Sequence, residues 1–574
     1  MRLSSVRIVS GISCLLFGAA AWLVGSGSTS DFTANAQTSK VASAKPAVSS
    51  TAEPAQLRPV SATTAKPANI PALPIAAPGT EIYIAKRGEA IPTIARRYLG
   101  KTSYLTSFDL ADAIRAVNHK PDASNILKAN ENIVIPGILA APITEKTIPV
   151  PKDFEVRAIY LTGIMAGSPH GMRIIKHWRE VGGNAVVFDI KDSDGSVTIP
   201  FEHPLLGPHQ VYIHDVPKFV RFLHQQNMHA IARIAMFRDE HLVVNHLELA
   251  VQSRKNKQAW RENGKLVWTD PSNPKVQDYD IALAKHVAQL GVDEIQFDYV
   301  RFPAEGDQKD AAFVYQKDQS DSAASDDSHV GTDAFVRPAT AKPSKTTTAA
   351  EAGNPKLEAK NPKTGGRKPE AAPRGPQRTD VITAFLKKAY AELHPTGVLL
   401  SLDVFGVMAW QRPVDLAHTG QDIVGMAHYC DVLSPMIYPS HFFGMDNIAH
   451  PGDEPAHFIG ESMDRFELIT KGSGVVIRPW LQAFHWRTKT YSPEYIKIQV
   501  ETAKAKGGIG FLFWNAANDY SKPYQAMPEM KAADAKAASG AGSKDKDKYR
   551  DSSRYFRGDE LPVATTQAAL TPTN

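Results

Sequence analysis

Cysteine is almost absent from this sequence, since Cys14 and Cys430 are the only two among 574 residues. This scarcity excludes a disulfide-stabilised scaffold and a cysteine-based metal site. A large excess of one charge is also missing, because the formal net charge is only +5. So small a charge does not indicate nucleic-acid binding. It fits either weak attraction to an anionic cell wall or membrane, or an ordinary soluble surface.

Several catalytic motifs are missing as well. The sequence has no G-x-S-x-G of serine hydrolases, no Walker loop for phosphoryl transfer and no H-E-x-x-H of zinc hydrolases. His203, His209 and His214 occur close together, but without the spacing of metal ligands. We therefore expect no metal and no cofactor.

The first 36 residues have the layout of an export signal. Arg2 and Arg7 precede an apolar run at residues 8–24, and an A-x-A site ends at Ala36. The run is long for a signal peptide and short for a membrane helix, so a cleaved signal and an uncleaved inner-membrane anchor both stay open. Either alternative predicts that the rest of the chain is exported to the periplasm or cell envelope.

Three stretches are rich in Ala, Pro, Ser, Thr and Lys and poor in aromatic residues, namely 37–78, 304–377 and 530–574. Chains of this composition cannot bury enough apolar surface to offset the entropy lost on folding. We expect a disordered linker, a disordered insertion and a disordered tail, in that order. Because regular patterning resumes after residue 377, the insertion interrupts a domain.

Residues 79–140 carry a pattern of their own. A short strand, a glycine turn, two amphipathic helices and a second strand predict the order β-α-α-β. This segment resembles the LysM module through "YIAKRGEAIPTIARRY", Asn118 and "NENIVIPG", although Glu89 stands where that family usually has Asp. The resemblance implies binding of peptidoglycan or another GlcNAc-type glycan. A small domain without sugar affinity is the alternative.

Between about 150 and 525, strand-like runs alternate with amphipathic helical stretches. Eight such pairs, with the insertion between the fourth and the fifth, predict an α/β fold, the (β/α)8 TIM barrel. A doubly wound open sheet is the alternative, but no G-x-G-x-x-G follows the first strand. The eight expected strands are residues 156–166, 184–192, 229–237, 292–302, 398–407, 432–442, 475–484 and 508–519.

One of these strands, "VDEIQFDYVRFP" at 292–303, carries Asp298 near the end of an otherwise apolar run. A barrel explains this position, because alternate strand residues face the lumen and the C-terminal strand ends build the active site. Asp403 ends the next strand along the barrel, so the two carboxyls should meet at its mouth. The same parity and the strand ends select the candidates for substrate binding, which are Asp189, Lys191, Arg233, Gln296, Arg301, Tyr438, Arg478, Trp480, Gln482, Trp514 and Asn515.

Carboxylates at several strand ends, with Tyr, Trp and Gln between them, suit cleavage of glycosidic bonds. In that reaction one protonated carboxyl donates to the leaving oxygen, and one carboxylate acts as nucleophile or base. We predict that Asp403 is the acid and Asp298 the nucleophile or base. Aromatic neighbours such as Phe405 would raise the pKa of the acid, and Arg301 or Arg233 would keep Asp298 charged.

The body of the chain resembles the glycoside-hydrolase barrels of the DUF4015 family, which are thought to act on polysaccharides. The resemblance covers about 150–525 apart from the insertion, and it rests on "YLTGIMAG", "NAVVFDIKDSDGSVTIPF", "DEIQFDYVRFP", "LSLDVFG" and "DVLSPMIYPSHF". "MIYPS" and Trp514 are also similar to chitinase-like barrels. The D-x-x-D-x-D-x-E signature of those enzymes is missing, so their substrate-assisted mechanism is not implied.

The candidate carboxylates each have a structural alternative. Asp298 and Asp403 would then pair with arginines of the lumen in a network without a catalytic role. Asp189 and Lys191 would form an ion pair with each other. Asp192, the substitute if Asp403 points away, would belong to a turn after the second strand.

Trp480 and Trp514 are either platforms for sugar rings or core aromatics. The leading hypothesis for the whole chain is an exported polysaccharide hydrolase attached to the cell wall through residues 79–140. A non-catalytic glycan-binding envelope protein is the first alternative. A polysaccharide deacetylase is the second, and it would need an Asp/His/His metal set that the sequence does not display.

Overall fold

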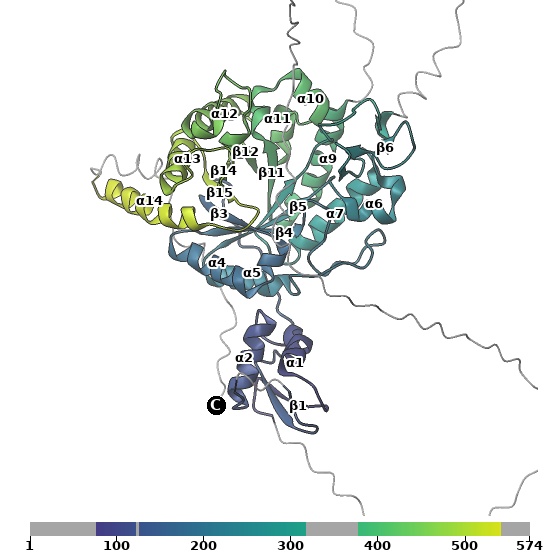
Figure 1. Ribbon diagram of the computed structural model, residues 1–574, viewed down its shortest axis with the longest axis vertical. Helices are drawn as coiled ribbons and strands as arrows, with labels where there is room; N and C mark the ends of the chain where they lie inside the picture. Colours follow the sequence, from purple (N-terminus) through teal and green to yellow (C-terminus); the bar gives the residue numbers. More distant parts are fainter. Residues whose placement is uncertain (1–75, 122–125, 317–376, 541–574) are drawn as a thin grey trace, which may run out of the picture.

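The computed structural model describes residues 76–121, 126–316 and 377–540, whose arrangement is shown in Figure 1. The predicted export signal at 1–36 and nearly all of the predicted linker at 37–78 lie outside these residues. In the part of the chain that is described, no helix is both long enough and apolar enough to cross a membrane.

The large body is a closed parallel barrel, which confirms the predicted fold class. The sheet closes because β11 pairs with β9 on one side and with β12 on the other. β13 and β14 are two halves of one barrel strand, since both pair with β12 and Pro479, which has no N–H to donate, lies between them. The barrel strands are β3 (Val156–Leu161), β4 (Ala185–Lys191), β5 (His229–Ala235), β9 (Glu294–Asp298), β11 (Leu399–Phe405), β12 (Val432–Ile437), β13 (Val476–Ile477), β14 (Trp480–Gln482) and β15 (Gly510–Trp514).

Helices follow the barrel strands and form the outer layer (Figure 1). Several begin at a polar residue followed by proline, and Ser168, Asn273 and Ser492 each accept a hydrogen bond from a backbone N–H of the first turn. Such caps satisfy N–H groups that have no partner within the helix. The helices are α3 (Gly163–Ala166), α4 (Pro169–Glu180), α5 (Val216–Gln225), α6 (Glu240–Asn245), α7 (Pro274–Ala288), α9 (Arg378–Leu393), α10 (Pro413–Thr419), α11 (Ile423–Met426), α12 (Pro455–Ile469), α13 (Pro493–Ala505) and α14 (Ser521–Gly540).

Short elements complete the barrel loops. The 3-10 helices are η2 (Leu247–Leu249), η3 (His394–Thr396), η4 (Gly406–Trp410), η5 (Ala427–Tyr429), η6 (Pro439–His441) and η7 (Pro451–Asp453). The short strands are β6 (Gln252–Ser253), β7 (Arg261–Glu262), β8 (Leu266–Val267) and β10 (Ala311–Ala312). All four short strands lie in the loops that follow β5 and β9, at the C-terminal end of the barrel.

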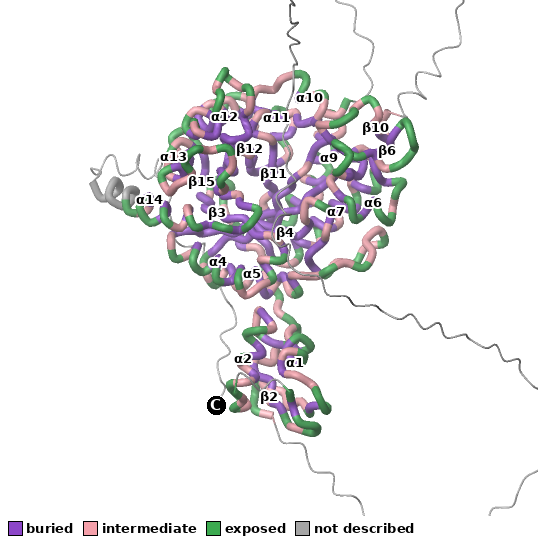
Figure 2. The backbone as a smooth tube through the Cα atoms, viewed as in Figure 1, coloured by how far each residue is buried: buried purple, intermediate pink, exposed green. Residues whose placement is uncertain are grey.

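The strands are buried on both faces, as Figure 2 shows by their colour. Along β3, Ile159 and Leu161 pack into the large core between the strands and the helices. Ala158 and Tyr160 belong to a separate cluster inside the barrel. The period of two along each strand therefore decides which side chains reach the lumen.

Two predicted boundaries are wrong where they meet the barrel. Residues 304–316, expected to be part of the insertion, are folded, because β10 pairs with β6 and Phe313 is buried in the core. Residues 530–540, expected to be tail, continue α14. The composition of the two predicted segments as a whole misled the prediction, although a few apolar residues such as Phe313 are enough to fix one end of a segment on an existing core. The remainder of both predicted segments, 317–376 and 541–574, lies outside the described residues.

A small body precedes the barrel and has the element order β-α-α-β. Strands β1 (Thr80–Ile84) and β2 (Asn132–Pro136) pair in antiparallel fashion, and α1 (Ile91–Tyr98) and α2 (Ser107–Val117) pack on them around a separate apolar core, with η1 (Leu99–Lys101) between the helices. Asn118 joins α2 to β2, since its amide donates to Val134 O over 2.8 Å and accepts from Val134 N over 2.9 Å. The side-chain amide of Asn118 therefore stabilises the packing of α2 on β2 within this body.

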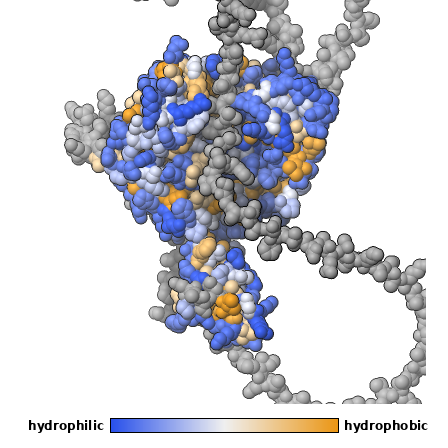
Figure 3. Space-filling view, viewed as in Figure 1, coloured by the Kyte–Doolittle hydropathy of each residue, from blue (hydrophilic) through white to orange (hydrophobic). Residues whose placement is uncertain are grey.

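The small body lies against α5 at the outside of the barrel (Figure 1). Lys218 of α5 donates to Leu99 O over 2.9 Å, and Leu105 packs against the core of the barrel. The connecting chain is fixed as well, because Glu145 binds Arg221 over 2.8 Å. In Figure 3 the surface is mostly hydrophilic, with separate hydrophobic patches on both bodies.

Candidate active site

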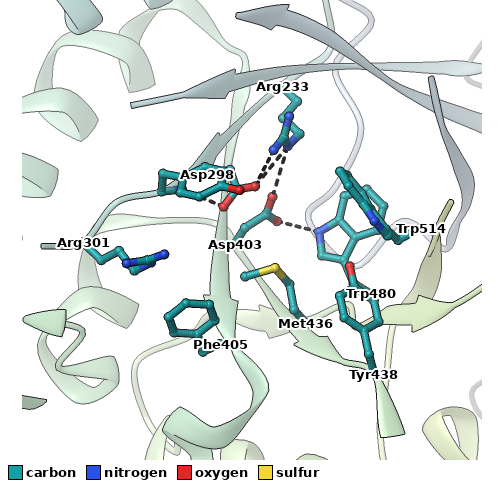
Figure 4. Close-up of a pocket in the computed structure, with 10 residues that line it drawn as sticks. Arg233, Asp298, Arg301, Asp403, Phe405, Met436, Tyr438, Trp480 and Trp514 are labelled. Atoms are coloured by element: carbon teal, nitrogen blue, oxygen red, sulfur yellow. Dashed lines mark hydrogen bonds and ion pairs between the residues drawn. The ribbon is translucent and has the colours of Figure 1, made fainter. Parts of the chain in front are cut away.

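A pocket with about 400 Å3 of empty space opens at the C-terminal ends of the barrel strands. This is the end at which enzymes of this fold class place their active sites. Figure 4 shows acidic and basic groups in its middle and aromatic rings at both sides. Its lining residues are Arg233, Asp298, Tyr299, Arg301, Asp403, Phe405, Met436, Tyr438, Trp480 and Trp514.

Asp298, the last residue of β9, is bound by Arg233 of the neighbouring strand β5. Nη2 and Nε of Arg233 donate to Asp298 Oδ2 over 2.6 and 3.2 Å. The other oxygen accepts the backbone N–H of Tyr299 over 2.6 Å. Tyr299 has a φ of 54°, which a bulky residue rarely adopts, so the backbone is strained at the residue directly after Asp298. Asp298 is thus held in one orientation at the floor of the pocket.

Asp403 of β11 lies next to Asp298 and faces the same guanidinium (Figure 4). Its Oδ2 is 3.9 Å from Arg233 Nε, and its Oδ1 accepts the indole N–H of Trp480 over 2.6 Å. Burial raises the pKa of Asp403 well above its usual range, and the charge of Asp298 adds to this rise, while Arg233 opposes it. Asp403 therefore holds its proton at a pH where an ordinary aspartate is ionised.

Arg233 has further contacts besides those with Asp298 and Asp403. Its Nη1 donates to Asp189 Oδ1 over 2.5 Å, and Asp189 also accepts the hydroxyl of Tyr160. The guanidinium lies 5.6 Å from the ring of Tyr160 and 5.4 Å from that of Trp514. Burial raises the pKa of Asp189 to about 7, although Arg233 lowers it. Asp189, predicted to bind substrate, instead positions the arginine shared by the two carboxyls.

Arg301 occupies one end of the pocket and is only 8% exposed. Its guanidinium lies 4.6 Å from the ring of Trp268 and 4.5 Å from that of Phe405, and Nη1 donates to Phe302 O over 3.0 Å. It forms no ion pair with Asp298. Of the two arginines proposed to hold that carboxylate, only Arg233 does so.

Two predicted binding residues lie deeper in the lumen. Arg478 donates from Nη1 to both oxygens of Glu294 over 2.9 Å, and His229 Nε2 is 3.0 Å from the same carboxylate. Gln296 is fully buried, and its side-chain N and O have no hydrogen-bond partner among the described residues. Neither Arg478 nor Gln296 lines the pocket. The prediction that both bind substrate is wrong because of their depth in the barrel. Residues of one parity share the lumen, but only those at the strand ends reach its mouth.

Lys191 points away from the lumen, contrary to the prediction. The strand pairing of β4 with β5 shifts between Asp189 and Lys191, so the alternation of sides is broken there. Lys191 Nζ lies 2.8 Å from Asp239 and 2.8 Å from Asp280 of α7, in a fully buried triad. The alternative of a Lys191–Asp189 ion pair is wrong too, because each residue has other partners.

Three further predicted residues lie at or just beyond the ends of barrel strands and do not line the pocket. Asp192 accepts the backbone N–H of Ser193 over 2.5 Å. Gln482 accepts from Ser440 N over 3.2 Å and donates to Phe484 O over 3.0 Å. The third, Asn515, donates to Ala483 O over 2.6 Å. Their polar groups fix the loop backbones, so Asp192 is corrected from substitute acid to turn residue, and the other two from sugar ligands to loop anchors.

Some site residues escaped the prediction. Tyr160 has lumen parity on the first strand, a signal that was available but not used. Tyr299 follows Asp298 and has the wrong parity, and only its left-handed backbone brings it into the pocket. Met436 lies on β12 two residues before Tyr438, so the same parity would have found it. Within the described ranges, no cluster of three or more His, Cys, Asp or Glu residues could hold a metal ion.

The arrangement can perform acid–base chemistry on a polar ligand. One carboxyl retains a proton because it is buried beside another acid, and its neighbour is bound to a guanidinium. A bond placed between Asp403 and Asp298 would meet a proton donor on one side and a carboxylate on the other. Trp514 is partly exposed, and its ring stacks on that of Tyr160 at 4.1 Å. It presents a flat apolar surface beside the two carboxyls.

Comparison of the sequence with protein families finds a match with DUF4015, described as "Putative glycosyl hydrolase domain", over residues 158–520. A comparison with curated proteins finds no match. Solved structures give more distant likenesses. A hypothetical protein from Ruminiclostridium thermocellum ATCC 27405 is 28% identical, with 43% of this chain and 97% of that chain covered, at a TM-score of 0.30.

Two other solved structures have names that include an activity. The PgaB (BpsB) glycoside hydrolase domain from Bordetella bronchiseptica is 12% identical, covering 65% of this chain and 99% of that chain at a TM-score of 0.40. The spore cortex-lytic enzyme SleL from Bacillus megaterium QM B1551 is 11% identical, covering 79% and 86% at a TM-score of 0.34. These TM-scores are low, so the barrel assignment rests on the strand pairing described above.

Proposed function

The chain belongs to the DUF4015 family of glycoside hydrolase domains, and we propose that it is an exported hydrolase of cell-envelope polysaccharides. In this proposal Asp298 and Asp403 cleave the O-glycosyl bond in the pocket of the barrel. The observation that carries it is that two neighbouring carboxyls face the single guanidinium of Arg233, which lies 2.6 Å from Asp298 and 3.9 Å from Asp403.

Asp403 is the general acid in this mechanism. Its burial and the neighbouring Asp298 charge keep it protonated, so it can donate to the glycosidic oxygen as the bond to that oxygen breaks. The sugar carbon then carries developing positive charge, which the Asp298 carboxylate stabilises. Trp480 orients the acid through its indole N–H.

Asp298 acts as the nucleophile in this proposal: one of its oxygens bonds to the sugar carbon as the protonated leaving oxygen departs. Water then breaks this ester bond and frees Asp298, while the deprotonated Asp403 takes the proton of that water. One oxygen of Asp298 lies 3.2 Å and one oxygen of Asp403 lies 3.9 Å from the same atom, Arg233 Nε. In Figure 4 both carboxyls lie on the same side of this guanidinium, whereas the ~6.5–9.5 Å separation of inverting enzymes would require these oxygens on opposite sides of the nitrogen, and ~5–5.5 Å is typical of retaining enzymes. The product should therefore keep the anomeric configuration of the substrate, which NMR of the initial product can measure.

The aromatic rings divide by exposure into two roles. Trp480 is only 1% exposed and donates to the acid, so its role is to position Asp403. Trp514 is partly exposed and backed by Tyr160, and we assign it as the platform for a sugar ring. Of the two alternatives left open for these tryptophans, this assigns the core role to one and the platform role to the other.

We propose that residues 79–140 attach the enzyme to peptidoglycan or another GlcNAc-type glycan. A separate apolar core supports this part as a module of its own. Phe108 and Ile126 expose 68% and 74% of their surface, which offers apolar area to a ligand. Purified residues 79–140 should sediment with insoluble peptidoglycan, while residues 141–540 should stay in the supernatant. If residues 79–140 stay in the supernatant, this role is contradicted.

From the sequence of residues 1–36 we propose that the protein is exported. If residues 8–24 are not cleaved off, they anchor it in the inner membrane. A fusion of residues 1–40 to alkaline phosphatase, which is active only outside the cytoplasm, tests export. Separating membrane from periplasmic fractions then distinguishes anchoring from cleavage. A cytoplasmic, inactive fusion would contradict the proposed location.

The test of the activity is release of reducing sugar from a panel of bacterial polysaccharides. The wild type should cleave at least one member, and Asp298→Asn should lower kcat by at least ~10³-fold, because it removes a group needed only for bond cleavage. Asp278→Asn is the matched control, since this exposed carboxylate on α7 pairs only with Lys388 at the surface. A protein that binds these polymers but cleaves none would be the non-catalytic glycan-binding alternative.

A further inference from the structure

A second cavity lies beside the pocket at the C-terminal end of the barrel. It contains about 760 Å3 of empty space between the loop that follows β12 and the loop that follows β14. These are the loops that carry on from Tyr438 and Trp480 of the pocket. We call this cavity the second cleft, and its lining residues are Phe443, Ala449, His450, Pro451, Asp453, Arg487, Thr488 and Lys489.

A row of aromatic rings connects the pocket with the second cleft. The ring of Tyr438, which lines the pocket, lies 5.5 Å from that of His441, and His441 lies 4.6 Å from Trp486. Trp486 in turn lies 5.8 Å from Phe443, which lines the second cleft. These ring contacts pack the two cavities against one cluster of rings, with the pocket at Tyr438 and the second cleft at Phe443.

Arg487 is an exposed cation of the second cleft, beside Lys489, whose Nζ lies 3.7 Å from Asp453. Its guanidinium lies 4.1 Å from the ring of Phe443 and 4.7 Å from that of Trp486. Within the described part of the chain it forms no ion pair. The acidic residue of the lining, Asp453, is occupied by Lys489, whose backbone N–H it accepts over 2.6 Å. The rings orient the guanidinium of Arg487 but leave its N–H groups available.

Arg301 repeats this arrangement inside the pocket. It is clamped between Trp268 and Phe405, and it too forms no ion pair with any described residue. Its charge acts on Glu305 only at longer range. At 8% exposure, a guanidinium without a carboxylate partner is costly, and the two rings offset only part of that cost.

We propose that the substrate is an acidic polysaccharide whose sugar carboxylates bind Arg301 in the pocket and Arg487 in the second cleft. The planar guanidinium fork matches a carboxylate with two parallel hydrogen bonds. Two such forks are held by aromatic rings and have no carboxylate partner among the described residues, one at the end of the pocket opposite Tyr438 (Figure 4) and the other in the second cleft. The inference deepens the proposed hydrolase function and rests on it for the direction in which the polymer runs.

Binding to soluble polysaccharides in native gels tests this inference without requiring cleavage. The gels contain alginate, polygalacturonate or hyaluronan, and the paired neutral gel contains fully methyl-esterified polygalacturonate. The purified full chain should be retarded by at least one acidic polymer and not by the ester. Arg301→Gln and Arg487→Gln should each weaken binding at least about tenfold, the loss expected for a charge-assisted pair.

Arg173→Gln is the matched control, because it removes one exposed positive charge from α4, on the outside of the barrel. It should leave binding unchanged, since a general attraction of a basic protein to an acidic gel would respond to it equally. The small body is identical in all variants, so its own affinity cancels. If Arg301→Gln does not fold, Arg487→Gln still decides, because that side chain is exposed.

The outcomes separate this inference from the proposed function. Equal loss in Arg173→Gln and Arg487→Gln, or no preference for acidic over neutral polymer, overturns the acidic substrate. Cleavage of neutral polysaccharides alone also overturns it while supporting the hydrolase. Arginine-dependent binding of an acidic polymer without any cleavage supports the recognition proposed here and contradicts hydrolysis.

Discussion

The indole N–H of Trp480 donates to Asp403 Oδ1 over 2.6 Å, and both side chains are 1% exposed. A hydrogen bond to the charged form of a carboxyl lowers its pKa, so this contact moderates the rise that burial imposes on Asp403. The contact joins β14 to β11 across the lumen. It therefore orients the side chain of Asp403, the proposed acid, and contributes to the pKa at which that side chain loses its proton.

Replacing Trp480 by Phe keeps a ring in the lumen but removes the donor. The pKa of Asp403 should rise further, because only the lowering contribution is lost. Since a general acid works in its protonated form, the basic limb of the kcat/KM profile against pH should move to higher pH. The profile of the wild type is the reference. An unchanged limb, or one that moves to lower pH, would contradict the assignment of Asp403 as the acid.

Lys191→Met should destabilise the protein without affecting substrate binding. The substitution leaves Asp239 and Asp280 buried without their cation, a change that costs roughly 3–5 kcal/mol. The melting temperature should fall by several degrees, while KM of the folded fraction should match the wild type. Lys388→Met, at an exposed pair, should change neither value. A raised KM in Lys191→Met would return this lysine to the substrate site.

The Glu294–Arg478 pair should contribute to stability in acid. Burial opposes the charge of Glu294, but Arg478, His229 and Ser401 together outweigh it and lower the pKa of Glu294 to about 2, from an ordinary value of 4.5. A carboxyl with a lowered folded pKa stabilises above its ordinary value and loses this contribution as the pH falls toward 2. Acid unfolding of the wild type should therefore be steep between these pH values.

Glu294→Gln should flatten that part of the acid-unfolding curve and also lower stability at neutral pH, because Arg478 then stays buried without a carboxylate. Circular dichroism from pH 2 to 7 measures both effects. Glu392→Gln removes an exposed partner of Lys285 and serves as the control. A parallel shift of the whole curve, with no change in slope, would show that another group causes the acid transition.

Two deletions should behave differently at the insertion. Replacing residues 317–376 by a short Gly/Ser linker should change the melting temperature by no more than a few degrees, because loop length has a small effect on stability. Arg378 donates to Gln308 Oε1 over 3.0 Å, so the two ends lie close together. Removing residues 304–377 should cause unfolding or aggregation, since it also deletes β10 and buried Phe313. Similar behaviour of both variants would contradict the revised boundary.

Parity along the strands placed most of the central residues from sequence. Asp298, Asp403 and Arg233 lie on one side of their strands, and the closed barrel brings them to one pocket. Parity failed at Lys191, where a shift in strand pairing reverses the sides. A bulge of this kind depends on how two strands pair, and the residue types at this position do not predict it.

Depth and partner choice were beyond the reach of the sequence. Arg478 and Arg301 look equivalent there, as single arginines on or after barrel strands. In the structure Arg478 meets Glu294 below the pocket, whereas Arg301 lies between two rings at its edge. Which cation meets which carboxylate depends on the stagger of neighbouring strands, and that is set by the closure of the whole sheet.

The sequence by itself determined the eight strand–helix pairs, because burial on both faces of a parallel sheet requires apolar runs of recognisable length. It also determined that polar residues of one parity gather in the lumen. Only the tertiary structure decided that Asp298 and Asp403 face one guanidinium, that of Arg233, and that Arg301 has no carboxylate partner among the described residues. These contacts join strands far apart in the chain, and the energy of a buried charge depends on the groups within a few ångströms of it, whatever their sequence separation.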